Sequence, residues 1–134
     1  MSLGNTTEND LGLLLFNPTA LSWNAATDLQ VHLHVGDPGE GGSTATSPAT
    51  YGSYAPVTVA RSGAGWTVAG NTTSNAALVQ FPQCSSGTNT ITHVSISPSA
   101  SSQIIASGAL TSSLSVSTGI QPQFAIGALS IVFD

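Results

Sequence analysis

The sequence has very few charged side chains. Among its 134 residues, Arg61 is the one basic residue against six acidic ones, and charged residues make up 5% of the chain, whereas about 25% is usual in a soluble domain. A protein that binds nucleic acid places several lysines or arginines against the phosphates, and attraction to an anionic membrane surface needs the same side chains. We therefore expect neither nucleic acid nor a membrane among the partners.

Cysteine and long apolar runs are also scarce. Cys84 is the only cysteine, so the chain cannot form an internal disulfide or a zinc site built from cysteines. No apolar run approaches the roughly 18 residues of a membrane span, and the N-terminus lacks the basic segment that begins a secretory signal. We expect a protein made in a cytoplasm, whose stability comes from packing, hydrogen bonds or other subunits.

Small and hydroxyl-bearing residues are abundant. The chain contains 20 serines, 16 threonines, 14 glycines and 7 prolines, yet 40% of its residues are hydrophobic. This apolar content and the low charge argue against disorder, and the length suits one domain. The sequence therefore predicts one folded domain whose polar surface consists mainly of hydroxyl and backbone groups.

Residues 1–28 differ from the rest and are predicted to form an N-terminal arm. A short helix is expected at about residues 8–16, with Thr7 as a possible N-cap, although Gly12 weakens it. Its apolar side chains cover more than one helix face, so this element either enters the core or packs on a neighbouring subunit. The predicted assembly interface consists of Leu11, Leu13, Leu14, Leu15 and Phe16.

From residue 29 onward the hydrophobic pattern has a period of two, which is typical of β-strands. In the first segment one face carries Leu29, Val31, Leu33 and Val35, and the other carries Gln30, His32 and His34. Eight later segments are candidate strands: 54–60, 65–69, 75–81, 90–97, 103–110, 113–116, 120–124 and 128–133. Their spacing predicts one all-β domain over residues 29–134, an antiparallel β-sandwich that is jelly-roll-like, although an immunoglobulin-like sandwich leaves similar traces.

A glycine-rich turn follows the first strand. In GDPGEGG, Pro38 can set the backbone of the second turn position and Gly39 can adopt the positive φ of the third. The stretch from Gly41 to Gly52 contains mainly Ser, Thr, Ala, Gly and Pro. It is predicted to be a long exposed loop.

Three histidines suggest one alternative, a metal site. His32 and His34 point to the same face of a strand, and Glu40 and His93 could complete a set of ligands of the kind found in cupin-like barrels. The spacing between His34 and Glu40 does not suit that pattern. We favour imidazoles on a solvent or interface face, and expect no metal and no other cofactor.

Other chemical patterns are weaker still. No G-x-S-x-G motif is present, and Cys84 lies in a loop with no obvious base nearby. Asp37 and Glu40 are interpreted as solvated turn residues rather than a catalytic pair. Four aromatic residues could form a sugar-binding platform, but in a chain with 6% aromatic residues we expect most of them in the core. These four are Trp23, Tyr51, Tyr54 and Trp66. We do not expect an enzyme.

The order of several motifs resembles that of a family of small bacteriophage structural proteins. The motifs are LHVGDPGEGG, YGSYAPVTV, NTTSNAALVQFP, ITHVSIS and GALSIVF, and the resemblance extends from Leu11 to Phe133. Members are described as tail-fibre-like or capsid decoration proteins. The chain departs from the family where Pro56 replaces an arginine and where residues 98–102 replace an acidic turn. The resemblance implies a structural role in the virion, without catalysis or cofactor.

The charge pattern favours one version of that role. Faces with few charges can pack on another protein without the cost of desolvating ions, and the apolar arm is a natural anchor. The leading hypothesis is a capsid decoration (cement) protein on the outer surface of the virion, a homotrimer that binds the major capsid protein. The alternative is a tail component, either a fibre base or a host-surface adhesin, and the third is the cupin-like metal-binding domain.

Overall fold

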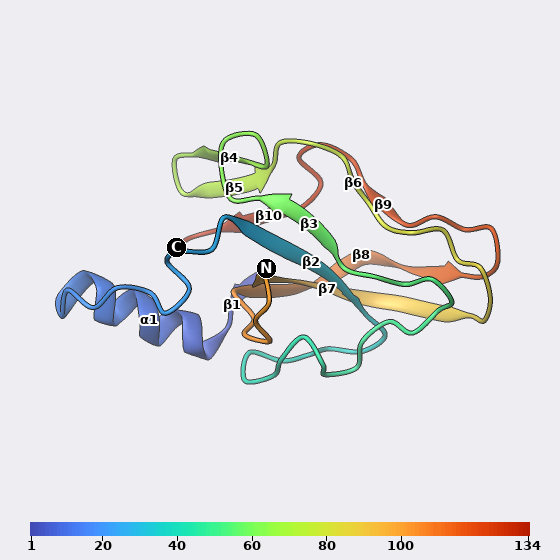
Figure 1. Ribbon diagram of the computed structural model, residues 1–134, viewed down its shortest axis with the longest axis horizontal. Helices are drawn as coiled ribbons and strands as arrows, with labels where there is room; N and C mark the ends of the chain where they lie inside the picture. Colours follow the sequence, from blue (N-terminus) through green and yellow to red (C-terminus); the bar gives the residue numbers. More distant parts are fainter.

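The computed structural model describes residues 1–134 and contains one helix and ten strands (Figure 1). The helix α1 spans Asn5–Phe16. The strands are β1 (Ser2–Leu3), β2 (Asp28–His34), β3 (Val57–Ala60), β4 (Trp66–Ala69), β5 (Thr72–Asn75), β6 (Val79–Gln80), β7 (Asn89–Pro98), β8 (Ala106–Val116), β9 (Gln123–Phe124) and β10 (Ser130–Val132).

An antiparallel five-stranded sheet forms the first layer, with the order β1-β8-β7-β2-β3. Along β2 and β7, Val31 lies opposite Ile96 and Leu33 lies opposite Val94. All four side chains are buried, because alternate residues of a strand point to the same face of a sheet. The inward face of β2 is therefore the one that its alternation predicted.

Two smaller antiparallel sheets form the second layer. Their strand orders are β10-β5-β4 and β6-β9, and they cover the apolar face of the large sheet (Figure 1). The core between the layers contains 16 buried residues, among them Phe81, Ile91 and Val116. The prediction of an all-β antiparallel sandwich with a short N-terminal helix is confirmed.

Some strand boundaries differ from those predicted. From Ala106 onward, the segments 103–110 and 113–116 form one continuous strand, β8, whose pairing with β7 is interrupted by an irregularity between Ile91 and His93. The segment 75–81 splits, because β5 ends at Asn75 and β6 begins at Val79. The Asn75 side chain bonds the carbonyls of Ala77 and Ala125, which stabilises this turn in place of a continued strand.

The other face of the large sheet is polar and is covered by loops. Residues 36–50 lie below the sheet in Figure 1, and the backbone of Thr44 donates to the Ser102 carbonyl in the neighbouring loop. The prediction that residues 41–52 form an exposed loop is wrong in part, since Ala49 and Tyr51 are 4% and 3% exposed. Gly39 adopts the predicted positive φ, 70°.

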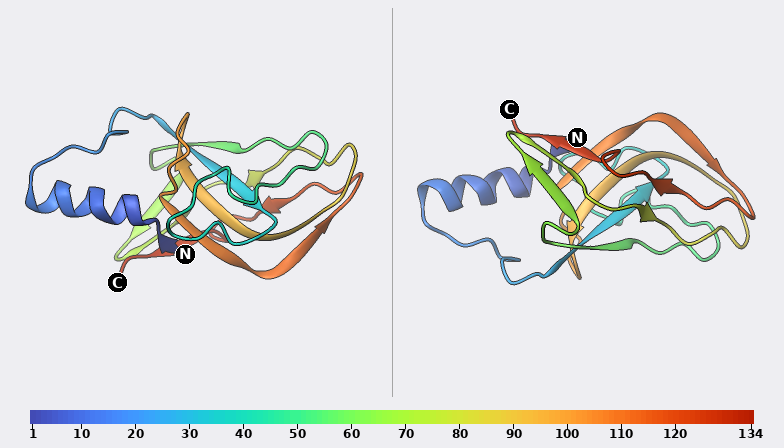
Figure 2. Two further views of the ribbon diagram at one scale, coloured as in Figure 1. Left: turned by 90° about the horizontal axis from the view of Figure 1, so that it is seen from below. Right: turned by 90° about the horizontal axis from the view of Figure 1, so that it is seen from above.

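The N-terminal residues join the sheet before the helix begins. Ser2 and Leu3 pair with Ser107 and Ala106 of β8, and α1 then leaves the sandwich at one end (Figure 2). The helix begins at Asn5 rather than at residue 8, and Thr7 is not its N-cap. The chain contains no helix that is long and apolar enough to span a bilayer.

Candidate assembly site

The base of α1 is fixed to the sandwich by specific contacts. Gly4, the N-cap, is buried, and a Cβ there would collide with the Ile104 carbonyl oxygen. The Thr7 hydroxyl donates to the same oxygen at 3.1 Å, which explains why it does not cap the helix. The Gln103 side chain donates to Thr7 and, at 2.9 Å, to Asp10. These contacts fix the orientation of the first two turns of α1 relative to the sandwich.

The other end of α1 is exposed and apolar. Leu11 and Leu13 are partly buried, whereas Leu14, Leu15 and Phe16 are 41%, 72% and 84% exposed. We call these last three residues the tip. The five residues predicted as an assembly interface thus lie on one helix, and exposure increases along it towards the tip.

The tip also presents unpaired backbone carbonyls. The amide groups of residues 17 and 19 both donate to the Leu13 carbonyl, and Pro18 has no N–H to donate to Leu14. The carbonyls of the tip consequently have no backbone donor. They form the negative end of the helix dipole, and the last turn contains no basic side chain.

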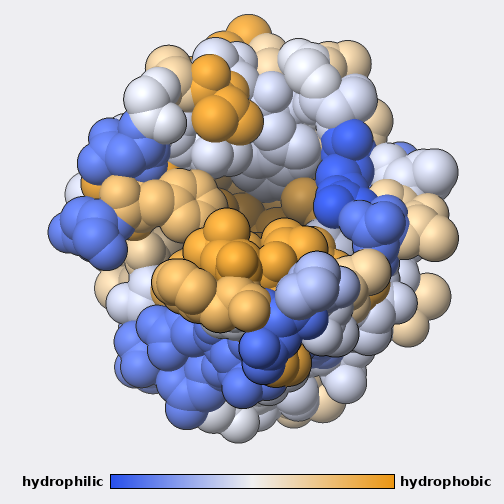
Figure 3. Space-filling view, turned by 90° about the vertical axis from the view of Figure 1, so that its left-hand side faces the viewer, coloured by the Kyte–Doolittle hydropathy of each residue, from blue (hydrophilic) through white to orange (hydrophobic).

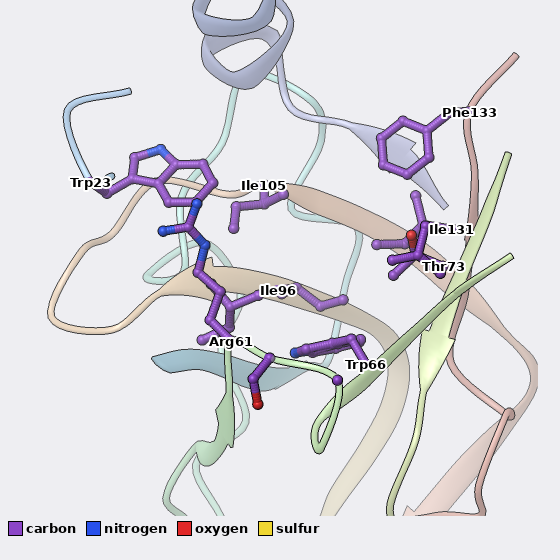
Figure 4. A pocket seen from close by; sticks show the side chains of 12 residues that line it. Trp23, Arg61, Trp66, Thr73, Ile96, Ile105, Ile131 and Phe133 are labelled. Atoms are coloured by element: carbon purple, nitrogen blue, oxygen red, sulfur yellow. The ribbon is translucent and has the colours of Figure 1, made fainter. Parts of the chain in front are cut away.

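A pocket of about 480 Å³ opens at the end of the sandwich from which α1 leaves. Its walls come from both layers (Figure 4). The large sheet and its edge contribute Leu29, Ile96 and Ile105, the second layer contributes Trp66, Val68, Thr73 and Ile131, and the rest are Trp23, Arg61, Ser62, Gly63 and Phe133. We call this the end pocket.

Figure 3 looks at the end of the molecule from which α1 projects. Apolar side chains gather near the centre of this view, beside a hollow. The base of α1 adjoins the end pocket, because the Gly4 amide donates to the carbonyl of Ile105, a lining residue, at 3.0 Å. The end pocket and the apolar helix therefore belong to the same end of the molecule.

Arg61, the one basic side chain, lies at the end pocket. Its guanidinium is 4.8 Å from the centre of the Trp23 ring, within the range of a cation–π contact. One of its nitrogens donates to the carbonyls of Asn24 and Ala26 at 2.9 and 3.1 Å. These contacts hold the segment that returns from α1 to β2 and place a positive charge beside an apolar cavity.

Both tryptophans of the chain line this pocket, and neither indole N–H has a hydrogen-bond partner in the chain. Trp66 is only 8% exposed, and its nitrogen lies at the end of the ring nearer Arg61 (Figure 4). Buried polar groups are nearly always bonded, and leaving one unbonded costs about 1–3 kcal/mol. Both nitrogens are enclosed by the chain itself, so the rings contribute apolar surface to the wall of the end pocket.

The structure does not assemble the histidines into a metal site. His34 and His93 are opposite each other on β2 and β7, but no cluster of three or more His, Cys, Asp and Glu side chains could hold a metal ion. His34 bonds the Thr46 carbonyl at 2.8 Å and the Ser95 hydroxyl at 2.7 Å. The expectation that it faces solvent or an interface is wrong, because the loop of residues 36–50 covers it and leaves it 0% exposed.

The hydrogen bonds define the tautomer of His34, and the lowered pKa values define the protonation state of both His32 and His34. A carbonyl only accepts, so His34 Nδ1 donates to Thr46 and the neutral Nε2 accepts from Ser95. Burial lowers the pKa of His34, and burial together with the neighbouring His34 lowers the pKa of His32 to about 4. Both rings are neutral at pH 7, and His32 bonds the Ser97 hydroxyl at 2.9 Å.

The remaining candidates are dispersed. Cys84 is buried, and its Sγ lies 3.2 Å from the Ser86 carbonyl oxygen. The four aromatic residues considered as a sugar platform separate into two pairs. Trp23 and Trp66 line the end pocket. Tyr51 and Tyr54 pack edge to face at the core, with their ring centres 5.3 Å apart.

Comparison with known proteins identifies the family. The model of a family described as podophage GP4 fiber I protein gp80 matches residues 2–132. The chain belongs to this family. It is therefore a structural protein of a phage virion, the role that the family resemblance implied. A search of curated proteins gave no match.

Sequence reasoning missed the end pocket. Its lining residues come from seven separate parts of the chain between Trp23 and Phe133, and no local pattern connects them. One signal was present: the chain has a single basic residue and two tryptophans, and Arg61 is close in sequence to Trp66. The contact of Arg61 with Trp23, however, depends on how the segment after α1 returns to the sheet.

Proposed function

We propose that this protein is a subunit of a virion fibre and that the exposed tip of α1 holds it in the fibre assembly. The observation that carries the proposal is the position of α1. Its base is bonded to the sandwich through Gly4, Thr7 and Gln103, while its last residue, Phe16, is 84% exposed. A helix held in this way presents apolar side chains to another molecule.

The family description supports a fibre rather than a capsid role, because it names a fibre protein and matches nearly the whole chain. The surface supports assembly in general. Charged residues make up only 5% of the sequence, so a close contact with another subunit desolvates few ions. The proposed partners are other virion proteins and further copies of this chain.

The proposed role is mechanical rather than catalytic. The side chains that are chemically most reactive make contacts within the chain. His34 bonds Thr46 and Ser95, and the Cys84 sulfur lies against backbone carbonyls. In this position they help to hold loops on the sandwich. We accordingly assign them to stability.

The experiment uses phage that carry the protein with Leu15→Ser and Phe16→Ser. The matched control is Ile126→Ser, which removes another apolar side chain that is 71% exposed, compared with 72% for Leu15. Purified virions are analysed by quantitative mass spectrometry, gold labelling and adsorption to host cells. We expect the tip variant to lose the protein from the tail and to lose adsorption, with the control unchanged.

Copy number distinguishes the fibre from the capsid. A fibre subunit is expected in tens of copies at most, located at the tail. Copies as numerous as the major capsid protein, with adsorption intact and lower resistance to heat after loss of the protein, would overturn the proposal in favour of a capsid decoration protein. Normal incorporation of the tip variant would overturn the role of α1.

A further inference from the structure

We infer that the end pocket is the receptor for the tip of α1 from a second copy of this chain, and that two copies dock reciprocally. This inference rests on the proposed role of the tip and names its partner. Two independent features match: apolar surface and charge. Both lie at the one end of the molecule from which α1 projects.

The apolar surfaces match first. The tip exposes two leucines and a phenylalanine, and the end pocket is lined mainly by apolar side chains, with Val68 and Phe133 73% and 44% exposed. Ordinary side-chain exposure is unremarkable on its own. Here, however, an exposed apolar helix end and an apolar cavity are carried by the same chain, and a volume of about 480 Å³ lies within the range of ligand-sized pockets.

The charges also have opposite signs. The carbonyl end of a helix carries a partial negative charge of about half an elementary charge, and α1 has no basic side chain in its last turn to offset it. Arg61, the chain's one basic residue, lies at the end pocket. Docking would bring it close to the tip of the partner.

Geometry makes the pairing reciprocal. The base of α1 adjoins the end pocket at Ile105, and twelve helical residues extend about 18 Å, so the tip lies well away from the pocket of its own chain. Two copies that meet end to end with antiparallel α1 helices place each tip at the base of the other helix. Such a contact is isologous and closes at two copies.

The test uses the full-length purified chain in sedimentation equilibrium from micromolar to millimolar concentration. The wild type is expected to form a dimer. The tip variant, with Leu15→Ser and Phe16→Ser, and the pocket variant Gly63→Phe are each expected to dimerise about tenfold or more weakly. Gly63 lines the pocket, and a Cβ there meets no atom within 4 Å, so a larger side chain can be attached at this position without a clash at its Cβ. Ile126→Ser is the control, and urea unfolding verifies that all variants fold.

Mixing the two variants gives the decisive comparison. A mixed pair keeps one intact contact, from the tip of the pocket variant to the pocket of the tip variant, so the mixture should dimerise more strongly than either variant alone. A monomeric wild type, a trimer, or a mixture no stronger than its components would overturn the inference. If the wild type is monomeric while phage with the tip variant still lose the protein, the inference fails and the proposed function stands.

Discussion

The two ends of the sandwich differ in how their aromatic side chains pack and form hydrogen bonds. Near β6 and β9, which lie away from α1 (Figure 1), four aromatic rings pack in succession with ring centres 5.3, 6.4 and 6.1 Å apart: Tyr51, Tyr54, Phe81 and Phe124. The Tyr51 hydroxyl donates to the Pro82 carbonyl, and the Tyr54 hydroxyl accepts from the backbone of β2. At the α1 end, two tryptophans surround a cavity and their indole donors have no partner.

This difference indicates which end of the molecule satisfies its polar groups without a partner. The chain satisfies its buried polar groups at one end, as folded proteins normally do. At the other end two tryptophans that line a pocket keep buried, unbonded indole donors, and the exposed helix tip has carbonyl acceptors without a backbone donor. We call the end with satisfied polar groups the closed end and the end with the pocket and the exposed helix tip the open end. The open end is the one suited to assembly with another molecule.

The largest expected effect concerns core packing. Phe81 is 0% exposed, and Phe81→Ala should lower the free energy of unfolding by about 3–5 kcal/mol because it leaves a cavity. Leu15→Ala at the tip should change it by less than about 0.5 kcal/mol. Urea unfolding of the dilute protein measures both, and equal losses would contradict the division into a closed and an open end.

A smaller effect is expected in acid. The pKa values of His32 and His34 are lowered in the fold, so their contribution to stability is present above the unfolded pKa of about 6.5. It is lost as the pH falls from 6.5 towards about 4, the pKa of His32. Unfolding midpoints in urea at pH 7 and pH 5 should therefore differ.

Variants separate the histidines from the carboxylates in that measurement. His32→Gln can keep a bond to Ser97 but cannot titrate, so its midpoint should fall less between pH 7 and pH 5. His93→Gln is the matched control, because His93 lies 4.0 Å from Asp37 in a more exposed position. If His32→Gln loses as much stability in acid as the wild type does, the assignment is wrong.

Removing the Tyr51 hydroxyl measures the contribution of a single hydrogen bond at the closed end. Tyr51→Phe leaves the Pro82 carbonyl without its donor and should cost about 1–2 kcal/mol. The wild type should also lose stability as the pH rises from 10 through about 12, because burial raises the pKa of Tyr51 to about 12 and the neutral phenol is the form that the fold favours. The variant should lose less over this range.

The smallest effect is expected at the open end. Benzothienylalanine has the shape of tryptophan but no N–H, so placing it at position 66 removes an unbonded donor without creating a cavity. The dilute protein should be unchanged or slightly more stable, and association should be unchanged, because the Trp66 nitrogen is not accessible to a second copy. A loss of stability as large as that of Tyr51→Phe would show that the Trp66 N–H has a partner within the chain.

The sequence alone predicted the features that depend on local pattern. Alternation identified the inward face of β2, and the turn chemistry of GDPGEGG predicted the positive φ of Gly39. The leucine-rich segment gave the helix and its exposed apolar end. These succeed because the period of a strand, the backbone of a turn and the apolar run of a helix are set by neighbouring residues.

Features that depend on distant contacts were not predictable. His34 was expected near solvent, yet residues 36–50 fold back over it and bond it through Thr46. Thr7 was expected as an N-cap, but Ile104, 97 positions later, receives its hydroxyl. The end pocket exists only after both sheets, the return segment and the C-terminus have come together.

Intrinsic fluorescence reports directly on occupancy of the end pocket, because Trp23 and Trp66 are the only tryptophans and both line it. On dilution of the wild-type protein, we expect tryptophan emission to shift to longer wavelength as the tip of the second copy leaves the pocket. The variant with Leu15→Ser and Phe16→Ser should emit at the longer wavelength at every concentration. Identical spectra for both proteins across the whole range would show that the tip of α1 does not occupy the end pocket of a second copy.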